Sequence, residues 1–179
     1  MGHSNHDWSL FLHLLEIANI GVVADVRSYP SSRFAQFNAP ALKARLADAD
    51  IAYVHLPELG GRSIDGSPPD YERMAETPTF LRGLARVEEI AAGTRLALLC
   101  AEHEPTQCHR CLLVGRQLAL RGIEIGHILR DGTIEPNAAT EDRLLKLARQ
   151  ADDDLLASRA DRLAAAYRAQ TLKITRKTR

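Results

Sequence analysis

The chain has 179 residues, with 23 basic and 23 acidic side chains, so its formal net charge at neutral pH is zero. This balance excludes a strong overall attraction to nucleic acid or to an anionic membrane. Hydrophobic residues make up 45% of the sequence and aromatic residues only 5%, which suits a globular domain and disfavours an aromatic platform for single-stranded nucleic acid. No apolar run approaches the roughly 18 residues of a membrane span, so no membrane contact is expected.

The first third of the sequence predicts alternating helices and strands. Asp7 suits a helix N-cap, and the apolar residues after it recur at helical spacing. A short apolar run bounded by turn residues then predicts a buried parallel strand. Pro40 suits the first turn of a second helix. The expected elements are a helix over 7–19, a strand over 21–26, a helix over 40–48 and a strand over 51–55.

The remainder continues the alternation after a long Gly/Pro-rich loop over 59–69, a length that is often functional. Asp70 suits the cap of a short helix, and Asp131-Gly132 predicts a tight turn, with a small hairpin at Thr133-Ile134. The other expected elements are a helix over 78–92, a strand over 96–100, a central helix over 107–121, a fourth strand over 123–129 and helical sequence over 137–171 with a break at Asp152–Asp154.

This order predicts an α/β fold, a three-layer Rossmann-like sandwich in which a mostly parallel sheet of about four strands lies between helices. We expect two parts: an α/β domain over 1–135 and a C-terminal helical extension over 136–179 with a basic tail that starts at Lys173. A short basic tail is usually solubilising, so contact with nucleic acid is only weakly supported.

Polar motifs lie at the start of the chain and after the first three expected strands. The carboxyl ends of parallel strands meet at one edge of a sheet, where ligands tend to bind. We expect a thiol, carboxylates, imidazoles and guanidiniums to line one cleft there. Alternatively, Asp25, Arg27 and Glu102 form an ion-pair network that braces the loops. The candidate ligand-binding residues are His3, Ser4, Asn5, Arg27, Ser28, His55, Gly60, Gly61, Arg62, Cys108, His109 and Arg110.

Cys100 is the leading candidate nucleophile. It ends a strand and precedes a helix N-terminus, a position where dipole and nearby cations stabilise a thiolate. In this hypothesis Cys100 or Asp25 is the reactive group, Glu102 a general acid or base, and Arg27 and Arg110 hold the anion. A buried, structural cysteine is the alternative, and it is the commoner outcome for this residue type.

The three cysteines lie within twelve residues of one another. Cys100, Cys108, His109 and Cys111 offer soft metal ligands, but zinc sites usually carry paired cysteines on both sides of a loop, so we expect no metal and no cofactor. The N-terminus lacks the basic and apolar layout of a signal peptide. Closely spaced cysteines fit a reducing compartment better than a disulfide scaffold, which indicates the cytoplasm.

Four separated motifs together resemble a bacterial and archaeal family, that of the domain of unknown function 488. The resemblance covers about residues 2–132, and it assigns no activity. Members usually carry a short strand before the first motif, which this sequence lacks. The motifs are Gly2-His3-Ser4-Asn5, Asp25–Ser28 with Pro30, Tyr53–Gly61, and Leu99–Glu102 leading to Cys108–Arg110; His127-Ile128 matches the end of the pattern.

The function must therefore come from the chemistry of these residues. The sequence favours a small enzyme that acts on a phosphorylated, nucleotide-like or other anionic small molecule at the strand-end cleft. The alternative is a non-catalytic ligand-binding module or a nucleic-acid-linked accessory protein that uses the same cleft. The sequence leaves the substrate, the reaction class and the oligomeric state open.

Overall fold

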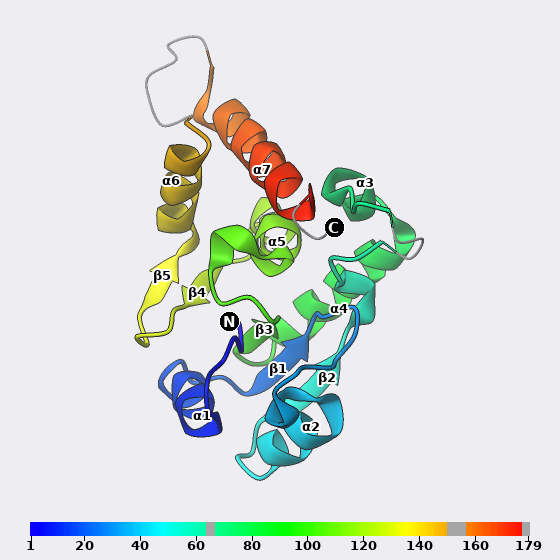
Figure 1. Ribbon diagram of the computed structural model, residues 1–179, viewed down its shortest axis with the longest axis vertical. Coiled ribbons are helices and arrows are strands. Elements are labelled where there is room, and N and C mark those ends of the chain that lie inside the picture. The colour runs from blue at the N-terminus through cyan, green and yellow to red at the C-terminus, as the bar shows by residue number, and fades with distance from the viewer. Residues whose placement is uncertain (64–66, 150–156, 177–179) are drawn as a thin grey trace.

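The computed structural model describes residues 1–63, 67–149 and 157–176, and it has a parallel β-sheet between two layers of helices (Figure 1). The α/β fold predicted from the sequence is therefore present. Val22 pairs with Ala52 on one side and with Leu96 on the other, so the three strands are in register from their first residues. The sheet has the order β2-β1-β3, with strands β1 (Val22–Asp25), β2 (Ala52–His55) and β3 (Leu96–Leu99).

The expected fourth strand is not part of this sheet. Instead, β4 (Gly126–Ile128) pairs antiparallel with β5 (Ile134–Pro136), in the small hairpin that the Asp131-Gly132 turn predicts. Gly132 has a φ of 87° there, a conformation that glycine adopts without strain. The edge of β3 is occupied by the start of the chain, where Gly2 forms a parallel bridge with Cys100 and the His3 N–H donates to the Cys100 carbonyl at 2.9 Å. The prediction of about four strands was wrong because this edge was already paired.

One face of the sheet is covered by α1 (Trp8–Ile17), the short 3₁₀ turn η1 (Ala35–Phe37) and α2 (Ala39–Ala47). The Asp7 side chain accepts from the Leu10 N–H at 2.8 Å, which confirms the predicted N-cap of α1. Pro40 lies in the first turn of α2, as expected. The side chains buried in this layer include Phe11, Leu14, Leu15, Val23, Phe37, Leu42, Leu46, Ala97 and Leu99.

The other face is covered by a larger group of helices, and its buried side chains include Ala24, Val26, Leu84, Leu112, Leu113, Leu144, Ala166 and Tyr167. The Asp70 side chain caps the helix that begins at Tyr71, and the Thr77 side chain caps the helix that begins at Pro78. The elements are η2 (Pro57–Leu59), α3 (Tyr71–Ala75), α4 (Pro78–Ala91), η3 (Pro105–Gln107), η4 (Arg110–Gly115), α5 (Arg116–Leu120), α6 (Asn137–Leu147) and α7 (Arg159–Arg176).

The central helix begins irregularly. The expected helix over 107–121 is a 3₁₀ turn, η3, followed by the π-helical η4 and then by α5. A Cβ at Gly115 would lie 3.0 Å from the Arg110 carbonyl oxygen, so the wide turn brings these two residues close together. Single π-turns within helices are rare and occur often at functional sites. This one starts at Arg110.

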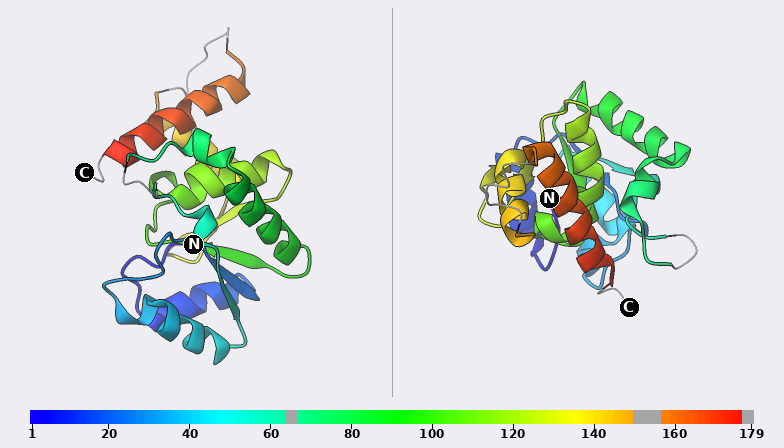
Figure 2. Two further views of the ribbon diagram at one scale, coloured as in Figure 1. Left: turned by 90° about the vertical axis from the view of Figure 1, so that its right-hand side faces the viewer. Right: turned by 90° about the horizontal axis from the view of Figure 1, so that it is seen from above.

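The two C-terminal helices belong to the same core as the sheet. Leu145 of α6 and Tyr167 of α7 are buried in one cluster with Ala24 and Val26. Figure 2 shows α7 at the opposite end of the molecule from α1 and α2. The expected break at Asp152–Asp154 and the last three residues of the basic tail lie outside the described residues. No helix in the described ranges is both long and apolar enough to cross a bilayer.

Candidate functional site

The polar motifs predicted to meet at one edge of the sheet lie at the carboxyl ends of the three strands. Asp25 ends β1, His55 ends β2, and Cys100 follows β3. The loop after β1 passes between the loops that follow the other two strands, so contacts from both reach it. The structure nevertheless divides these residues into two groups on opposite faces of the sheet.

The division follows from the register of β1 and β3. Asp25 pairs with Leu99, so these two side chains share the face that α1 and α2 cover. Side chains alternate along a strand, so Cys100 and Val26 face the other side, toward η4. Asp25 and Cys100, which the sequence placed in one cleft, are therefore separated by the sheet itself.

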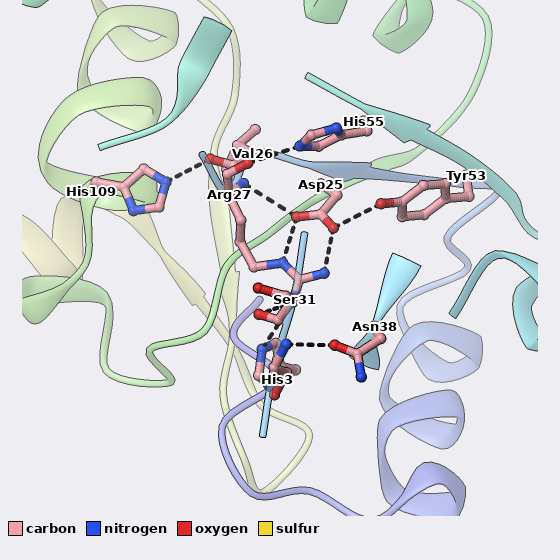
Figure 3. Close-up of polar contacts among 10 residues, drawn as sticks. His3, Asp25, Val26, Arg27, Ser31, Asn38, Tyr53, His55 and His109 are labelled. Carbon is pink, nitrogen blue, oxygen red and sulfur yellow. Dashed lines mark hydrogen bonds and ion pairs between the residues drawn. The ribbon is translucent and has the colours of Figure 1, made fainter. Parts of the chain in front are cut away.

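The first group is a buried ion pair, shown in Figure 3. The Arg27 guanidinium donates from Nε to Asp25 Oδ1 at 2.8 Å and from Nη2 to Oδ2 at 2.5 Å, and the Tyr53 hydroxyl donates to Oδ2 at 2.9 Å. Asp25 has no exposed surface and Arg27 is 5% exposed. Because both carboxylate oxygens are occupied, Asp25 braces the loop together with Arg27. Glu102, which the alternative interpretation placed in the same network, is exposed and takes no part in this ion pair.

His3 completes this group. Its Nε2 lies 3.4 Å from Arg27 Nη1, and its ring stacks on Phe37 with the centroids 4.4 Å apart. Burial lowers the pKa of His3 to about 4. A neutral imidazole can accept a hydrogen bond from the guanidinium, whereas a charged one would repel it.

Two further histidines hold the loop after β1. His109 Nε2 lies 2.8 Å from the Val26 carbonyl oxygen, and His55 Nε2 lies 2.9 Å from that of Arg27 (Figure 3). A carbonyl only accepts, so Nε2 carries the proton in both rings. In the neutral ring Nδ1 is then an acceptor. For His109 that nitrogen faces the neighbouring Cys108.

The glycine pair Gly60-Gly61 is explained by close packing. A Cβ at Gly60 would lie 2.2 Å from Ser28 Oγ, and a Cβ at Gly61 would lie 2.5 Å from the His109 Cβ. The Arg62 N–H donates to Ser28 Oγ at 3.3 Å. Thus the segment after η2 lies directly against the loop after β1 and against His109, while the Arg62 side chain stays exposed.

The second group, called here the thiol–guanidinium group, consists of Cys100, Cys108, His109 and Arg110. Arg110 Nη1 donates to Cys100 Sγ at 3.3 Å, and the Arg110 backbone N–H donates to Cys108 Sγ at 3.4 Å. The side chains of the two cysteines are near enough to act on each other's ionisation. His109 Nδ1 lies 3.9 Å from Cys108 Sγ. Both cysteines are 1% exposed and Arg110 is 2% exposed.

The two thiols differ in acidity. Burial raises the pKa of Cys100 well above the ordinary thiol value, and the interaction with the Cys108 thiol adds to this rise. Burial also opposes ionisation of Cys108. However, the interaction with the Cys100 thiol, the Arg110 charge and the Arg110 backbone N–H outweigh it and lower the pKa of Cys108. The more acidic thiol is therefore Cys108, whereas the sequence favoured Cys100.

Arg110 is incompletely satisfied. Its remaining contacts are with the carbonyl oxygens of Glu102 at 3.4 Å and of His103 at 3.5 Å, both long for hydrogen bonds. Its Nε is buried with no hydrogen-bond partner, and no carboxylate in the described ranges lies within ion-pair distance of it. The Glu104 carboxylate, which pairs with Arg143, acts on this guanidinium only through space, together with the neighbouring thiols.

Three candidate residues lie outside both groups. The Glu102 side chain is exposed, and only its carbonyl reaches Arg110. Ser4 is half-buried, and Asn5 is exposed and accepts from Arg130 Nη1 at 3.1 Å. These side chains are not brought to the buried thiols, because the loop that carries Glu102 turns its carbonyls inward and its side chains toward solvent.

Tyr53 and His127 belong to motifs named from the sequence, but neither was among the candidate site residues. Tyr53 lies two residues before His55 on the same strand, so the alternation of side chains could have placed it beside Asp25. His127 is buried, its Nε2 lies 3.1 Å from Asn137 Oδ1, and burial lowers its pKa to about 4. It lies in the hairpin that replaces the expected fourth strand, so its surroundings depend on that pairing.

The described residues form no metal cluster in these groups, and a cavity of the molecule lies apart from them. Within the described ranges, no three or more His, Cys, Asp or Glu side chains are arranged to hold a metal ion. A cavity of about 690 Å³ lies elsewhere, between α3, α5 and α7, and its lining includes Tyr71, Arg116 and Arg168.

Comparisons with known proteins identify the family alone. The model of the family described as "Domain of unknown function DUF488" matches residues 7–116, which is more than half of the chain. No curated protein and no solved structure matches the chain.

Proposed function

This chain belongs to the DUF488 family, whose description assigns no reaction, and we propose from the chemistry of its site that it is a small enzyme acting on an anionic small molecule. The negatively charged group of the substrate, such as a phosphate, binds to Arg110, and the thiolate of Cys108 is the reactive group. The single observation that carries this proposal is the buried Arg110 guanidinium, whose Nε has no partner in the described chain.

A buried cation with no carboxylate in direct contact is costly, because the effective penalty of removing an ion from water is several kcal/mol. The Cys108 thiolate offsets part of that penalty through the charge of Arg110 and its backbone N–H. A ligand oxygen at Nε would supply the missing acceptor. Planar recognition by Nε and Nη of one guanidinium is the usual way in which arginine binds phosphate and carboxylate.

His109 fits the role of general base for Cys108. Its Nε2–H is held by the Val26 carbonyl, so the free Nδ1 is the acceptor that faces the thiol at 3.9 Å. A nucleophile, a base and a group that orients the base form the usual arrangement for an activated thiol. Catalytic contacts of this kind are often long until a substrate is bound.

Access to the group requires movement of the segment Ala101–His103, whose residues are exposed and whose carbonyls cover Arg110. Opening must break the two long Arg110 contacts, the hydrogen bond from the Cys100 thiol to the Glu102 carbonyl at 3.3 Å and that from the Ser4 N–H to the Ala101 carbonyl at 2.9 Å. We place the reaction in the cytoplasm, where a free thiol stays reduced, and Cys100, Cys108 and Cys111 are all free.

The test compares alkylation of Cys108 by iodoacetate and by iodoacetamide, read by peptide mapping in a mass spectrometer. An isolated thiolate reacts faster with the neutral reagent, because like charges repel. We expect the folded protein to reverse this order at Cys108 and inorganic phosphate to slow the iodoacetate reaction. Arg110→Gln should restore the ordinary order, whereas Arg121→Gln, at an exposed arginine that pairs with Glu88, should not.

Faster reaction with iodoacetamide in the folded wild-type protein, together with no protection by phosphate, would reject anion binding at Arg110. Because the wild-type comparison uses no substitution, this outcome holds even if Arg110→Gln does not fold.

A non-catalytic ligand-binding module is the second candidate. It is favoured by the observation that His55 and His109 are held by backbone carbonyls and that Asp25 is fully paired with Arg27. In that case phosphate should bind in a calorimetric titration, while Cys108 stays unlabelled by either reagent until the protein unfolds. An accessory role with nucleic acid would instead give oligonucleotide binding that weakens steeply with salt, through exposed residues such as Lys173 and Arg176.

A further inference from the structure

We propose that Cys100 and Cys108 form a peroxide-reactive dithiol, in which a hydroperoxide oxidises Cys108 and Cys100 resolves the product as a disulfide. This oxidation uses the same thiolate as the proposed function but needs no anionic substrate. It is a modification of the protein itself, and it can occur whether or not Arg110 binds an anion.

The first support is the placement of the two sulfur atoms. Cys100 follows β3 and Cys108 precedes η4, and the loop between them returns the chain to the same face of the sheet. One residue contacts both, since Arg110 donates from Nη1 to Cys100 Sγ at 3.3 Å and from its backbone to Cys108 Sγ at 3.4 Å. The two side chains act on each other's ionisation, which places them as neighbours in this group.

The second support is the asymmetry of the pair. Cys108 receives the Arg110 backbone N–H at 3.4 Å and lies near the Arg110 charge, so its thiolate form is stabilised. Cys100 keeps its proton and donates to the Glu102 carbonyl at 3.3 Å. A stabilised thiolate beside a protonated second cysteine is the usual arrangement of a thiol that forms a sulfenic acid and then a disulfide.

Burial selects the oxidant. Both sulfurs are 1% exposed, so a large disulfide or a bulky electrophile reaches them poorly, whereas hydrogen peroxide is little larger than water. The Arg110 guanidinium contacts Cys100 Sγ and so places a positive charge next to the thiol pair, where negative charge develops on the departing oxygen. That charge stabilises the transition state for breaking the O–O bond.

Peroxide oxidises the pair in two steps. The Cys108 thiolate attacks one peroxide oxygen, the O–O bond breaks, and Cys108 becomes a sulfenic acid, while the departing hydroxide takes the Cys100 proton and leaves as water. The Cys100 thiolate then attacks the Cys108 sulfur, the S–O bond breaks, and the hydroxyl takes a proton from solvent and leaves as water. Two thiols and one peroxide give one disulfide and two waters.

Cys111 is an internal comparison. It is equally buried, at 1% exposed, but burial raises its pKa to about 12, so it stays protonated near neutral pH. The Arg110 backbone N–H donates to Cys108 Sγ and not to Cys111. Oxidation is therefore expected to spare Cys111.

The experiment treats the reduced full chain with hydrogen peroxide at neutral pH, blocks remaining thiols with N-ethylmaleimide in denaturant and maps the peptides by mass spectrometry. We expect loss of the two free thiols Cys100 and Cys108, a disulfide between them, and a blocked Cys111. Dithiothreitol should return both thiols. The matched control Cys111→Ser should form the same disulfide.

The Cys100→Ser variant should instead accumulate sulfenic acid at Cys108, which dimedone traps. Sulfinic acid at Cys108 in the wild-type protein with Cys100 still free, a disulfide that includes Cys111, or no oxidation before unfolding would each overturn the inference. The wild-type map decides the question even if a variant does not fold.

The two proposals fail in different ways. Disulfide formation without a preference for iodoacetate would reject only the anionic substrate. A preference for iodoacetate without disulfide formation would reject only the peroxide-reactive pair.

Discussion

Asp25 and Cys100 end neighbouring strands at the same edge of the sheet, yet their side chains lie on opposite faces of it. Asp25 pairs in register with Leu99, so the next residue of β3 points the other way. This one-residue offset separates a buried ion pair from a pair of buried thiols. It assigns bracing of the loop to Asp25 and leaves the reactive chemistry to the thiol–guanidinium group.

The ion pair predicts a large and specific loss of stability. Arg27→Met leaves the Asp25 carboxylate buried without its partner, which typically costs about 3–5 kcal/mol of unfolding free energy. Urea denaturation should show this loss. The double variant Asp25→Asn with Arg27→Met should lose clearly less than the sum of the two single changes, because both charges are then absent.

The matched control for this prediction is the exposed pair Arg86–Glu89, whose side chains are 55% and 68% exposed. Arg86→Met should change the unfolding free energy by less than about 0.5 kcal/mol, as exposed pairs contribute little. A similar loss in both single variants would contradict a structural role specific to Arg27.

Two buried histidines predict loss of stability in mild acid. Burial lowers the pKa of His3 and of His127 from 6.5 to about 4. Below pH 6.5 the unfolded chain binds protons that the folded chain excludes, so stability should fall as the pH drops from about 6.5 toward about 4. Each histidine contributes at most about 1.4 kcal/mol per pH unit in that window.

Urea midpoints measured across this window check the prediction. His127→Gln keeps a donor for the Asn137 amide but cannot be protonated, so its stability should depend less steeply on pH than that of the wild-type protein. Above pH 7 the two histidines are neutral in both the folded and the unfolded wild-type chain. The difference in stability between wild type and variant measured there is the baseline. Parallel curves for the two proteins would contradict the assignment to His127.

Gly61 predicts a steric effect on the site. In Gly61→Ala the added Cβ would lie 2.5 Å from the His109 Cβ, so the two segments must separate, and overpacking of this kind typically costs about 1–3 kcal/mol. Alkylation of Cys108 should also change, because His109 faces that thiol. In Gly93→Ala the nearest atom lies at 3.9 Å, so little effect is expected.

Urea denaturation and peptide mapping of both glycine variants give the comparison. Equal stability and equal labelling of Cys108 in Gly61→Ala and Gly93→Ala would show that the approach of Gly61 to His109 does not shape the site.

The sequence determined the local structure well, because local structure depends on neighbouring residues. The caps at Asp7 and Asp70 and the turn at Gly132 are short-range hydrogen bonds and backbone preferences, readable from a few residues. The alternation of strands and helices likewise indicated a parallel sheet with helices on both faces. The four polar motifs could also be placed at one edge of that sheet.

Only the tertiary structure decided which of these residues meet. The position of β4 depended on whether the edge of β3 was free, and residues at the chain start already occupied it. The separation of Asp25 from Cys100 depended on the register between strands, and the lower pKa of Cys108 depended on Arg110 and Cys100 converging on it. Register, burial and long-range contact are properties of the folded chain, so residue types and spacing alone could name the participants but not their partners.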